Sequence, residues 1–153
     1  MSNLLVQNIK HTNNTSAQTI DSSGRTTAVL NNDTTYRSDG GAVTQNMVQG
    51  LCKCWVNYTC ISTTAERDSF NVSSLTDITT GQTTVNINNN MANDDYSGYY
   101  YTNTDSNTAY TNFANTHAGG FGSFETGLFK HNSYSSTDVD AFQNLSGIFG
   151  DLA

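Results

Sequence analysis

The residues of this chain that could support catalysis are three histidines and many hydroxyl side chains. His11, His117 and His131 show no metal-ligand spacing and no H-x-x-x-H pair. A hydrolytic triad needs a nucleophile, a base and an orienting group that meet in space, and no G-x-S-x-G elbow marks a nucleophilic serine. Glu66 and Glu125 are the only glutamates, so paired catalytic carboxylates would come mainly from the aspartates. We therefore predict no enzyme activity and no catalytic residues.

Three cysteines, Cys52, Cys54 and Cys60, resemble half of a zinc or iron–sulfur site. On an extended strand, residues 52 and 60 would lie about 27 Å apart, so one ion could not bind both. All three share one strand face, which favours small buried thiols instead. An odd number of cysteines without a visible Sec-type signal peptide fits synthesis in a reducing compartment. We predict no metal site and no cofactor.

Two acidic segments could supply oxygen ligands for calcium. They are Asn93-Asp94-Asp95 and Asp138-x-Asp140, and neither belongs to a complete EF-hand loop. Asn and Asp are also the residues that turns prefer. Turn formation is the favoured interpretation, and calcium binding stays open.

Tyrosines gather in a stretch of fifteen residues. Consecutive tyrosines on a strand point to both of its faces, so at least one must point away from the core. Exposed aromatic rings among Asn, Asp and Thr suit sugar stacking or a subunit interface, and a plain half-buried strand is the third interpretation. The candidate binding residues are Tyr96, Tyr99, Tyr100, Tyr101 and Tyr110.

The composition limits what the chain can be. Asn, Ser and Thr make up 59 of the 153 residues, charged residues are 12%, and proline is absent. A net charge of −7 with six basic residues disfavours phosphate-backbone binding, so we predict no nucleic-acid partner. No apolar run approaches the roughly 18 residues of a membrane helix. The scarcity of strong helix formers disfavours long helices and favours an all-β chain.

Residues 51–153 are dense in short apolar–polar alternations. Cys52, Cys54, Val56, Tyr58 and Cys60 share one face of the first expected strand, and Lys53, Trp55, Asn57 and Thr59 lie on the other. Phe70 and Val72 are expected to point inward from a strand over residues 68–75. Turn clusters separate further expected strands, over residues 83–89, 98–103, 109–116, 126–131 and 141–149. The last could instead be a short helix, but Gly147 and Gly150 favour a strand. This spacing predicts an antiparallel β-sandwich or barrel.

Residues 1–50 contain too few apolar residues to enclose a core. Their apolar groups are separated by turn-prone stretches such as Asp21-Ser22-Ser23-Gly24. Residues 31–41 are expected to be a linker or a loop-rich crossing, and residues 42–50 a strand or one helical turn. The segment therefore either frays or buries its apolar side against another chain, and an ordered segment implies an oligomer or a docking partner. The predicted attachment or oligomerisation residues are Leu4, Leu5, Val6, Ile9, Ile20, Val29 and Leu30.

Several segments resemble tail-fibre-like structural proteins of marine bacteriophages. The N-terminal likeness lies in Val6-Gln7-Asn8-Ile9-Lys10-His11-Thr12-Asn13, Ala17 and Thr19-Ile20-Asp21-Ser22-Ser23-Gly24-Arg25. The distal likeness lies in Trp55-Val56-Asn57-Tyr58, Arg67-Asp68-Ser69-Phe70-Asn71-Val72-Ser73-Ser74-Leu75-Thr76-Asp77, Thr84-Val85-Asn86-Ile87 and Ile148-Phe149-Gly150-Asp151-Leu152-Ala153. Residues 96–138 carry no such likeness.

The resemblance implies a virion appendage protein, synthesised in the host cytoplasm and assembled as a homotrimer. Residues 1–50 would form an attachment or shaft segment with short strands. Residues 51–153 would form a jelly-roll-like distal β-sandwich that contacts a host-surface glycan or protein. Other virion proteins would be its partners, with no membrane insertion and no cofactor.

Three functional classes follow from these observations. The first is a tail-fibre or spike component that binds the host surface. The alternative is a capsid decoration or cement protein, or a tail connector, with no receptor binding. An enzyme that degrades surface polysaccharide ranks last.

Overall fold

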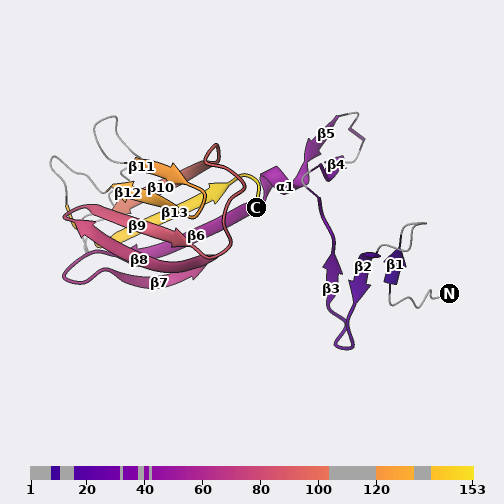
Figure 1. The fold of residues 1–153 in the computed structure, drawn as a ribbon, viewed down its shortest axis with the longest axis horizontal. Coiled ribbons are helices and arrows are strands. Elements are labelled where there is room, and N and C mark those ends of the chain that lie inside the picture. Colours follow the sequence, from indigo (N-terminus) through magenta and orange to yellow (C-terminus); the bar gives the residue numbers. More distant parts are fainter. Residues whose placement is uncertain are drawn as a thin grey trace. The chain divides into compact units, whose positions relative to one another are not determined.

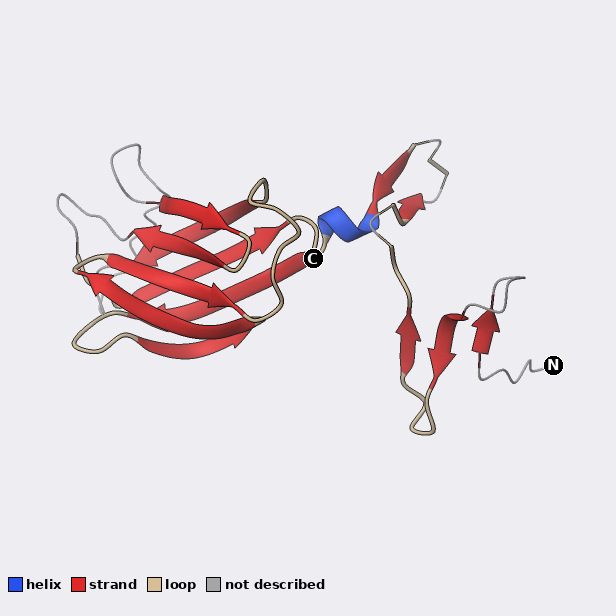
Figure 2. Cartoon of the chain, viewed as in Figure 1, coloured by secondary structure: helices blue, strands red, loops and turns tan. Residues whose placement is uncertain are grey.

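The computed structural model describes residues 8–10, 16–31, 33–37, 40–41, 43–103, 120–132 and 139–153. In this part of the chain, thirteen strands and one four-residue helix confirm the prediction of a mostly β protein (Figure 2). None of the described helical structure is long and apolar enough to cross a membrane. The chain divides into two compact units, residues 1–48 and residues 49–153.

The described part of the N-terminal unit forms two small antiparallel sheets. The first is three-stranded, in the order β1 (Asn8–Lys10), β2 (Ser16–Ile20) and β3 (Thr26–Ala28). The second pairs β4 (Thr35–Arg37) with β5 (Thr44–Asn46), which leads into α1 (Met47–Gly50). The stretch expected to be a linker thus contains a strand. Next to the β4–β5 pair, the Met47 amide donates a further hydrogen bond to the Thr34 carbonyl at 2.8 Å.

A five-residue turn joins β2 to β3, as the cluster Asp21-Ser22-Ser23-Gly24 predicts. The Asp21 carboxylate accepts hydrogen bonds from the amides of Ser23 and Arg25, at 2.8 and 2.9 Å. It also pairs with the Arg25 guanidinium at 2.8 Å. Gly24 has φ of 80°, in the left-handed region that glycine enters without a Cβ clash. The hydrogen bonds from Arg25 lower the pKa of Asp21 below its usual value.

The described residues of the second unit form two four-stranded antiparallel sheets, consistent with a β-sandwich (Figure 1). One sheet has the order β10-β13-β6-β7, and the other the order β11-β12-β9-β8. Consecutive strands pair as hairpins within a sheet at β6–β7, β8–β9 and β11–β12. The strands are β6 (Cys52–Thr59), β7 (Ala65–Phe70), β8 (Val72–Thr79), β9 (Gln82–Ile87), β10 (Ser97–Asn103), β11 (Gly120–Glu125), β12 (Leu128–Asn132) and β13 (Gln143–Phe149).

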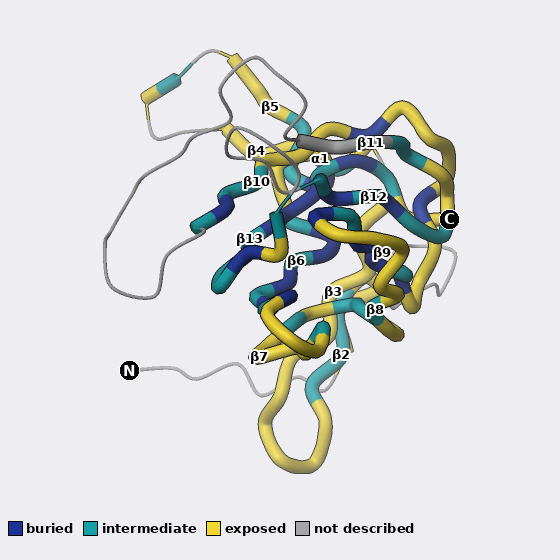
Figure 3. The backbone as a smooth tube through the Cα atoms, turned by 90° about the vertical axis from the view of Figure 1, so that its left-hand side faces the viewer, coloured by how far each residue is buried: buried dark blue, intermediate teal, exposed yellow. Residues whose placement is uncertain are grey.

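Both sheets contribute to a single apolar core. On β6, the alternation places Cys54, Val56 and Tyr58 inside at no more than 1% exposure, as its sequence predicts. Strands β6, β9, β12 and β13 accordingly contain most of the buried residues among those described in this unit (Figure 3). The core consists of Cys54, Val56, Tyr58, Cys60, Val85, Ile87, Met91, Tyr96, Phe129 and Ile148. The expected closing strand is confirmed as β13, and the helical alternative is wrong.

One expected strand is in fact two. The chain leaves β7 in one sheet and enters β8 in the other within a single residue, Asn71. Asn71 has φ of 60°, which asparagine tolerates better than most residues. Its side-chain amide donates to the Lys53 carbonyl at 2.9 Å and to the Asn89 carbonyl at 3.1 Å. Its side-chain oxygen accepts from the Asn89 amide at 2.7 Å. Asn71 therefore ties β6 to the end of β9 at the corner between the sheets.

Replacing Asn71 with alanine is expected to lower the free energy of unfolding by about 2–3 kcal/mol, because it removes these hydrogen bonds and strains a left-handed residue. Asn71→Gly removes the same bonds without that strain, so it should cost less. Urea unfolding of both variants measures the difference. Equal losses would show that the backbone angle contributes nothing to the stability of this corner.

Candidate functional site

The catalytic residue types that the structure brings together lie in the core. Ser146 of β13 places its Oγ 2.8 Å from Nδ1 of His131 on β12, and Thr102 of β10 places its Oγ1 3.0 Å from Nε2. The Thr102 hydroxyl donates to the Asn144 side-chain oxygen at 3.2 Å. A hydroxyl has one proton, so Thr102 must accept from Nε2–H, and Nδ1 then accepts from Ser146. Because burial keeps the ring of His131 neutral, these contacts place its single proton on Nε2.

This polar cluster is closed to substrates. His131 and Asn144 are 0% exposed, and Ser146 is 1% exposed. Desolvation lowers the pKa of His131 to about 3, and the rings of Tyr58 and Tyr100 stand edge-on to it at 5.8 and 5.3 Å. A general base needs to reach a substrate proton and to have a pKa near the working pH. Neither condition holds at His131, so the cluster serves to hold β10, β12 and β13 together.

The three cysteines are free thiols in the described structure. Cys54 and Cys60 are buried, which confirms the prediction for these two, and Cys52 is half-buried. Burial raises the pKa of Cys54 to about 12 and also raises the pKa of Cys60. Cys60 lies 3.2 Å from the Thr83 hydroxyl oxygen and within 3.5 Å of the Asn144 side-chain nitrogen. These contacts are those of a packed core residue.

The native protein is expected to show at most one reactive thiol at pH 8, because the thiolate is the reactive form and two of the three thiols are buried with raised pKa values. Titration with a chromogenic disulfide reagent measures this number, and unfolding in urea should then release all three. Two or three reactive thiols in the native protein would contradict the burial of Cys54 and Cys60.

Turn formation accounts for Asn93-Asp94-Asp95, whereas Asp140 binds the turn between β8 and β9. The Asn93 side-chain oxygen accepts from the Asp95 amide at 3.0 Å, and Asp140 accepts from the Gly81 amide at 2.9 Å. Asp138 lies outside the described residues. Among the residues that the structure describes, no three metal-binding side chains of His, Cys, Asp or Glu gather in one place.

The outer face of the sheet β10-β13-β6-β7 carries a row of aromatic side chains. Strand pairing aligns Tyr99 with Gly147, Gly147 with Trp55, and Trp55 with Phe70, so one row crosses all four strands. Tyr99 is 52% exposed and Phe70 is 54% exposed, while Trp55 is half-buried. We call Tyr99, Trp55 and Phe70 the outer aromatic row. At about 4.8 Å between neighbouring strands, the row spans roughly 14 Å of backbone.

Gly147 leaves room for the tyrosine ring within this row. A Cβ at position 147 would lie 2.5 Å from Cε1 and 2.7 Å from the hydroxyl oxygen of Tyr99. The ring of Tyr99 therefore reaches over Gly147 of the neighbouring strand. On its other side, the ring lies 6.2 Å from that of Phe149, at an interplanar angle of 43°. The row is thus a continuous feature of the sheet surface, from the edge strand β10 to the edge strand β7.

A second row lies beside the first, two residues along each strand. It aligns Tyr101 with Leu145, Leu145 with Asn57, and Asn57 with Asp68. The Asn57 side-chain oxygen is 3.5 Å from the Gln143 side-chain nitrogen. Amide and carboxylate groups therefore flank the outer aromatic row on the side of β6 and β7.

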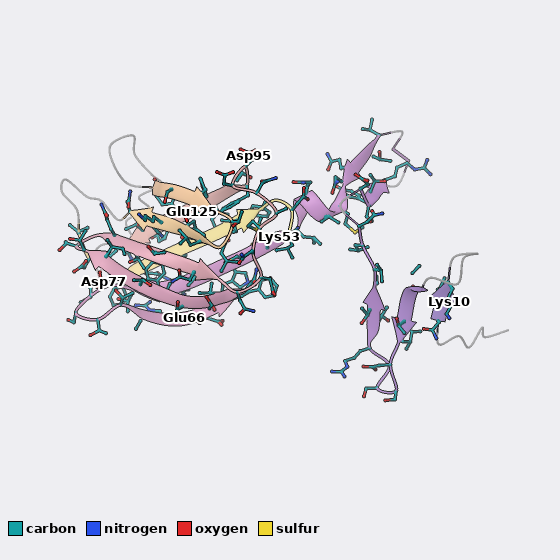
Figure 4. The ribbon with its side chains drawn as sticks, in the orientation of Figure 1. Lys10, Lys53, Glu66, Asp77, Asp95 and Glu125 are labelled. Carbon is teal, nitrogen blue, oxygen red and sulfur yellow. The ribbon has the colours of Figure 1, made fainter. Side chains whose placement is uncertain are left out.

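The outer face of the other sheet has a different character. Asn86 of β9 donates to the hydroxyls of Ser74 and Thr76 on β8, at 3.0 and 3.1 Å. Lys130 of β12 pairs in register with Thr84 of β9. The five labelled charged side chains of this unit come from different elements rather than from one cluster (Figure 4). An exposed aromatic row is thus a property of one face of the described sandwich.

The structure separates the predicted tyrosines. Tyr99 points outward, whereas Tyr100 points inward against His131, so the expectation that neighbouring tyrosines face opposite sides is confirmed. Tyr101 is half-buried in the second row.

Tyr96 was expected to be exposed but is 6% exposed, because its ring packs edge-on against Phe124 at 4.7 Å. Its hydroxyl lies 3.0 and 2.8 Å from the carbonyl oxygens of Glu125 and Leu128. Tyr110 lies outside the described residues.

Two members of the outer aromatic row were not among the predicted binding residues. Alternation on β6 places Trp55 opposite the core, and that signal was available in the sequence. Phe70 was expected to face inward and is instead exposed, because the corner at Asn71 separates its strand from that of Val72.

The predicted attachment residues fall in the N-terminal unit. Ile9 is 51% exposed, Val29 64% and Leu30 42%, and Ile20 is half-buried. Tyr36 and Val43 add further exposed apolar side chains. Leu4, Leu5 and Val6 lie outside the described residues. The described part of this unit therefore leaves most of its large apolar side chains in contact with solvent.

Comparison of the chain with protein-family models, curated proteins and solved structures finds no match.

Proposed function

We propose that this chain is a non-enzymatic structural protein of a bacteriophage virion, a tail-fibre or spike component. The N-terminal unit would attach it to the particle and to copies of itself, and the β-sandwich would present a surface to the host. The resemblance of both ends of the sequence to tail-fibre-like proteins supports this proposal. A jelly-roll-like connectivity and a trimeric state remain predictions that rest on the same resemblance.

The observation that carries the proposal is the contrast between the two units. The sandwich encloses a core from both sheets, whereas Ile9, Val29, Leu30 and Val43 of the N-terminal unit are all more than 40% exposed. Burial of an aliphatic side chain contributes about 1.5–3 kcal/mol, so these residues favour association with another chain. Homo-oligomers with closed symmetry are the commonest way to cover such a surface.

The same exposed residues also support the alternative, a decoration, cement or connector protein without receptor binding. Binding of the purified full-length chain to isolated host envelopes distinguishes the two functions. We expect saturable binding that leaves the envelope polysaccharide intact. Absence of binding, together with loss of particle stability when the chain is missing, would favour the decoration role. Release of sugar from the polysaccharide would establish an enzyme and overturn the proposal.

A further inference from the structure

We propose that the outer aromatic row is a binding surface for an extended, uncharged glycan. This inference rests on the proposed function and assigns its host-binding surface to the face formed by β10, β13, β6 and β7. The three rings of the row, on Tyr99, Trp55 and Phe70, would stack against successive sugar rings. Amide groups beside the row would donate hydrogen bonds to the sugar hydroxyls and accept them, and the carboxylate beside the row would accept them.

Exposure and alignment are the first support. Phe70 and Tyr99, the two ends of the row, are each more than half exposed. Single exposed apolar residues are ordinary on protein surfaces, whereas apolar side chains grouped on one face are a feature of interaction sites. Aromatic rings offer a large rigid contact area at a low cost in conformational entropy. A row of roughly 14 Å matches an elongated ligand better than a compact one.

The chemistry of the second row indicates which ligand fits. A protein interface of ordinary size has an apolar centre surrounded by a polar rim. Here Asn57 and Asp68 lie directly beside the aromatic row. Asn57 pairs in register with Leu145 on one side and with Asp68 on the other. A sugar presents C–H groups to an aromatic ring and hydroxyls to the adjoining polar groups, so it uses both rows together.

The charge of the chain decides between neutral and acidic glycans. The net charge is −7, and Asp68 contributes a carboxylate to the proposed surface. An anionic polysaccharide would approach a surface of its own sign, which slows association and weakens binding. The expected ligand class is therefore an uncharged oligosaccharide.

Trp55 provides the test, because it is the only tryptophan of the chain and belongs to the row. Its fluorescence is measured in the full-length protein during titration with cellohexaose, maltohexaose, mannohexaose and a hyaluronan hexasaccharide. We expect a saturable change with at least one of the three neutral hexasaccharides and none with the anionic one. No change with any neutral sugar, or an equal response to hyaluronan, would overturn the inference.

Two variants locate the binding. Phe70→Ser should weaken the affinity obtained from the fluorescence titration about tenfold, in line with the loss of one stacked ring. Ile78→Ser is the matched control, since Ile78 is 51% exposed on β8 of the other sheet, and it should leave binding unchanged. Gly147→Ala forces the Tyr99 ring off the row without removing it and should also weaken binding. Equal affinities of the Phe70→Ser and Ile78→Ser proteins would overturn the placement.

A second copy of the chain is the competing occupant of this face. If Phe70→Ser lowers the mass of the assembly in light scattering and no neutral sugar binds, the row is a subunit contact and the glycan inference is wrong. These outcomes leave the proposed virion role in place, because that role is tested by the presence of the chain on particles. Absence from particles with intact glycan binding would instead overturn the role and retain the binding surface.

Discussion

Lowering the pH from 7 to 4.5 is expected to remove about 2–3 kcal/mol from the free energy of unfolding through His131 alone. The unfolded state protonates this histidine near its ordinary pKa of about 6.5, whereas burial holds its folded pKa at about 3. Between these values the unfolded state binds the extra proton, so stability falls by about 1.4 kcal/mol per pH unit as the pH decreases. Well above pH 6.5 the contribution is constant, because His131 is neutral in both states. Urea unfolding at pH 7 and pH 4.5 measures the difference.

The control for this prediction is His131→Gln, which cannot take up a proton. The variant should be less stable at pH 7, because glutamine fills less of the space between Tyr58 and Tyr100. Its additional loss between pH 7 and pH 4.5 should be smaller than that of the wild type by about 2–3 kcal/mol. Carboxylates titrate in both proteins and cancel in the comparison. Equal acid losses in the two proteins would show that His131 is not buried in its neutral form.

Replacing the exposed apolar residues of the N-terminal unit is expected to dissociate the protein. The full-length chain should behave as an oligomer in light scattering. The triple variant Ile9→Ser, Val29→Ser and Leu30→Ser should shift its mass towards that of the 16.6 kDa chain. These three side chains are more than 40% exposed in the single chain, so their burial between chains is a large part of the apolar contribution that the described unit can offer.

The thermal unfolding of the sandwich should change little in this triple variant, because the core of residues 49–153 contains none of the substituted side chains. Ile78→Ser again serves as a matched control and should keep the oligomer intact. A full-length wild-type protein that remains a 16.6 kDa monomer at high concentration would refute the association. An unchanged mass of the triple variant would place the subunit contact elsewhere.

Local alternation predicted the elements that lie in the core. Cys54, Val56 and Tyr58 alternate with polar residues, and such a pattern determines which face is buried wherever one face of a strand is apolar. The closing strand was also predictable, since Gly147 and Gly150 disfavour a helix. Glycine at position 147 has a further role that the sequence does not reveal, which is to make room for the Tyr99 ring.

The errors arise where tertiary structure decides. Residues 68–75 appear continuous in sequence, and only the positive φ of Asn71 divides them between two sheets and exposes Phe70. Tyr96 lies in a polar stretch between β9 and β10, so no local pattern indicates that its ring packs on Phe124 and that its hydroxyl reaches the β11–β12 turn. The alignment of Tyr99, Trp55 and Phe70 depends on strand order, which the sequence alone does not specify.

The His131 cluster shows why residue types alone mislead about function. Ser146, His131 and Asn144 have the hydrogen-bonding groups of a catalytic set, yet they lie at no more than 1% exposure between the sheets. The hydrogen bonds from Ser146 to His131, and through Thr102 to Asn144, satisfy polar groups that would otherwise be costly to bury. The proposed ligand surface is instead the outer aromatic row, which is exposed at Tyr99 and Phe70.

The most direct test of the virion role is to find the chain on purified phage particles. Mass spectrometry of particles from cells that carry this gene gives its copy number, and antibodies raised against residues 49–153 locate it by electron microscopy. We predict a fixed number of copies per particle, with the sandwich accessible at the tail or spike. Particles that lack the chain, while it accumulates free in the infected cell, would contradict the proposed function.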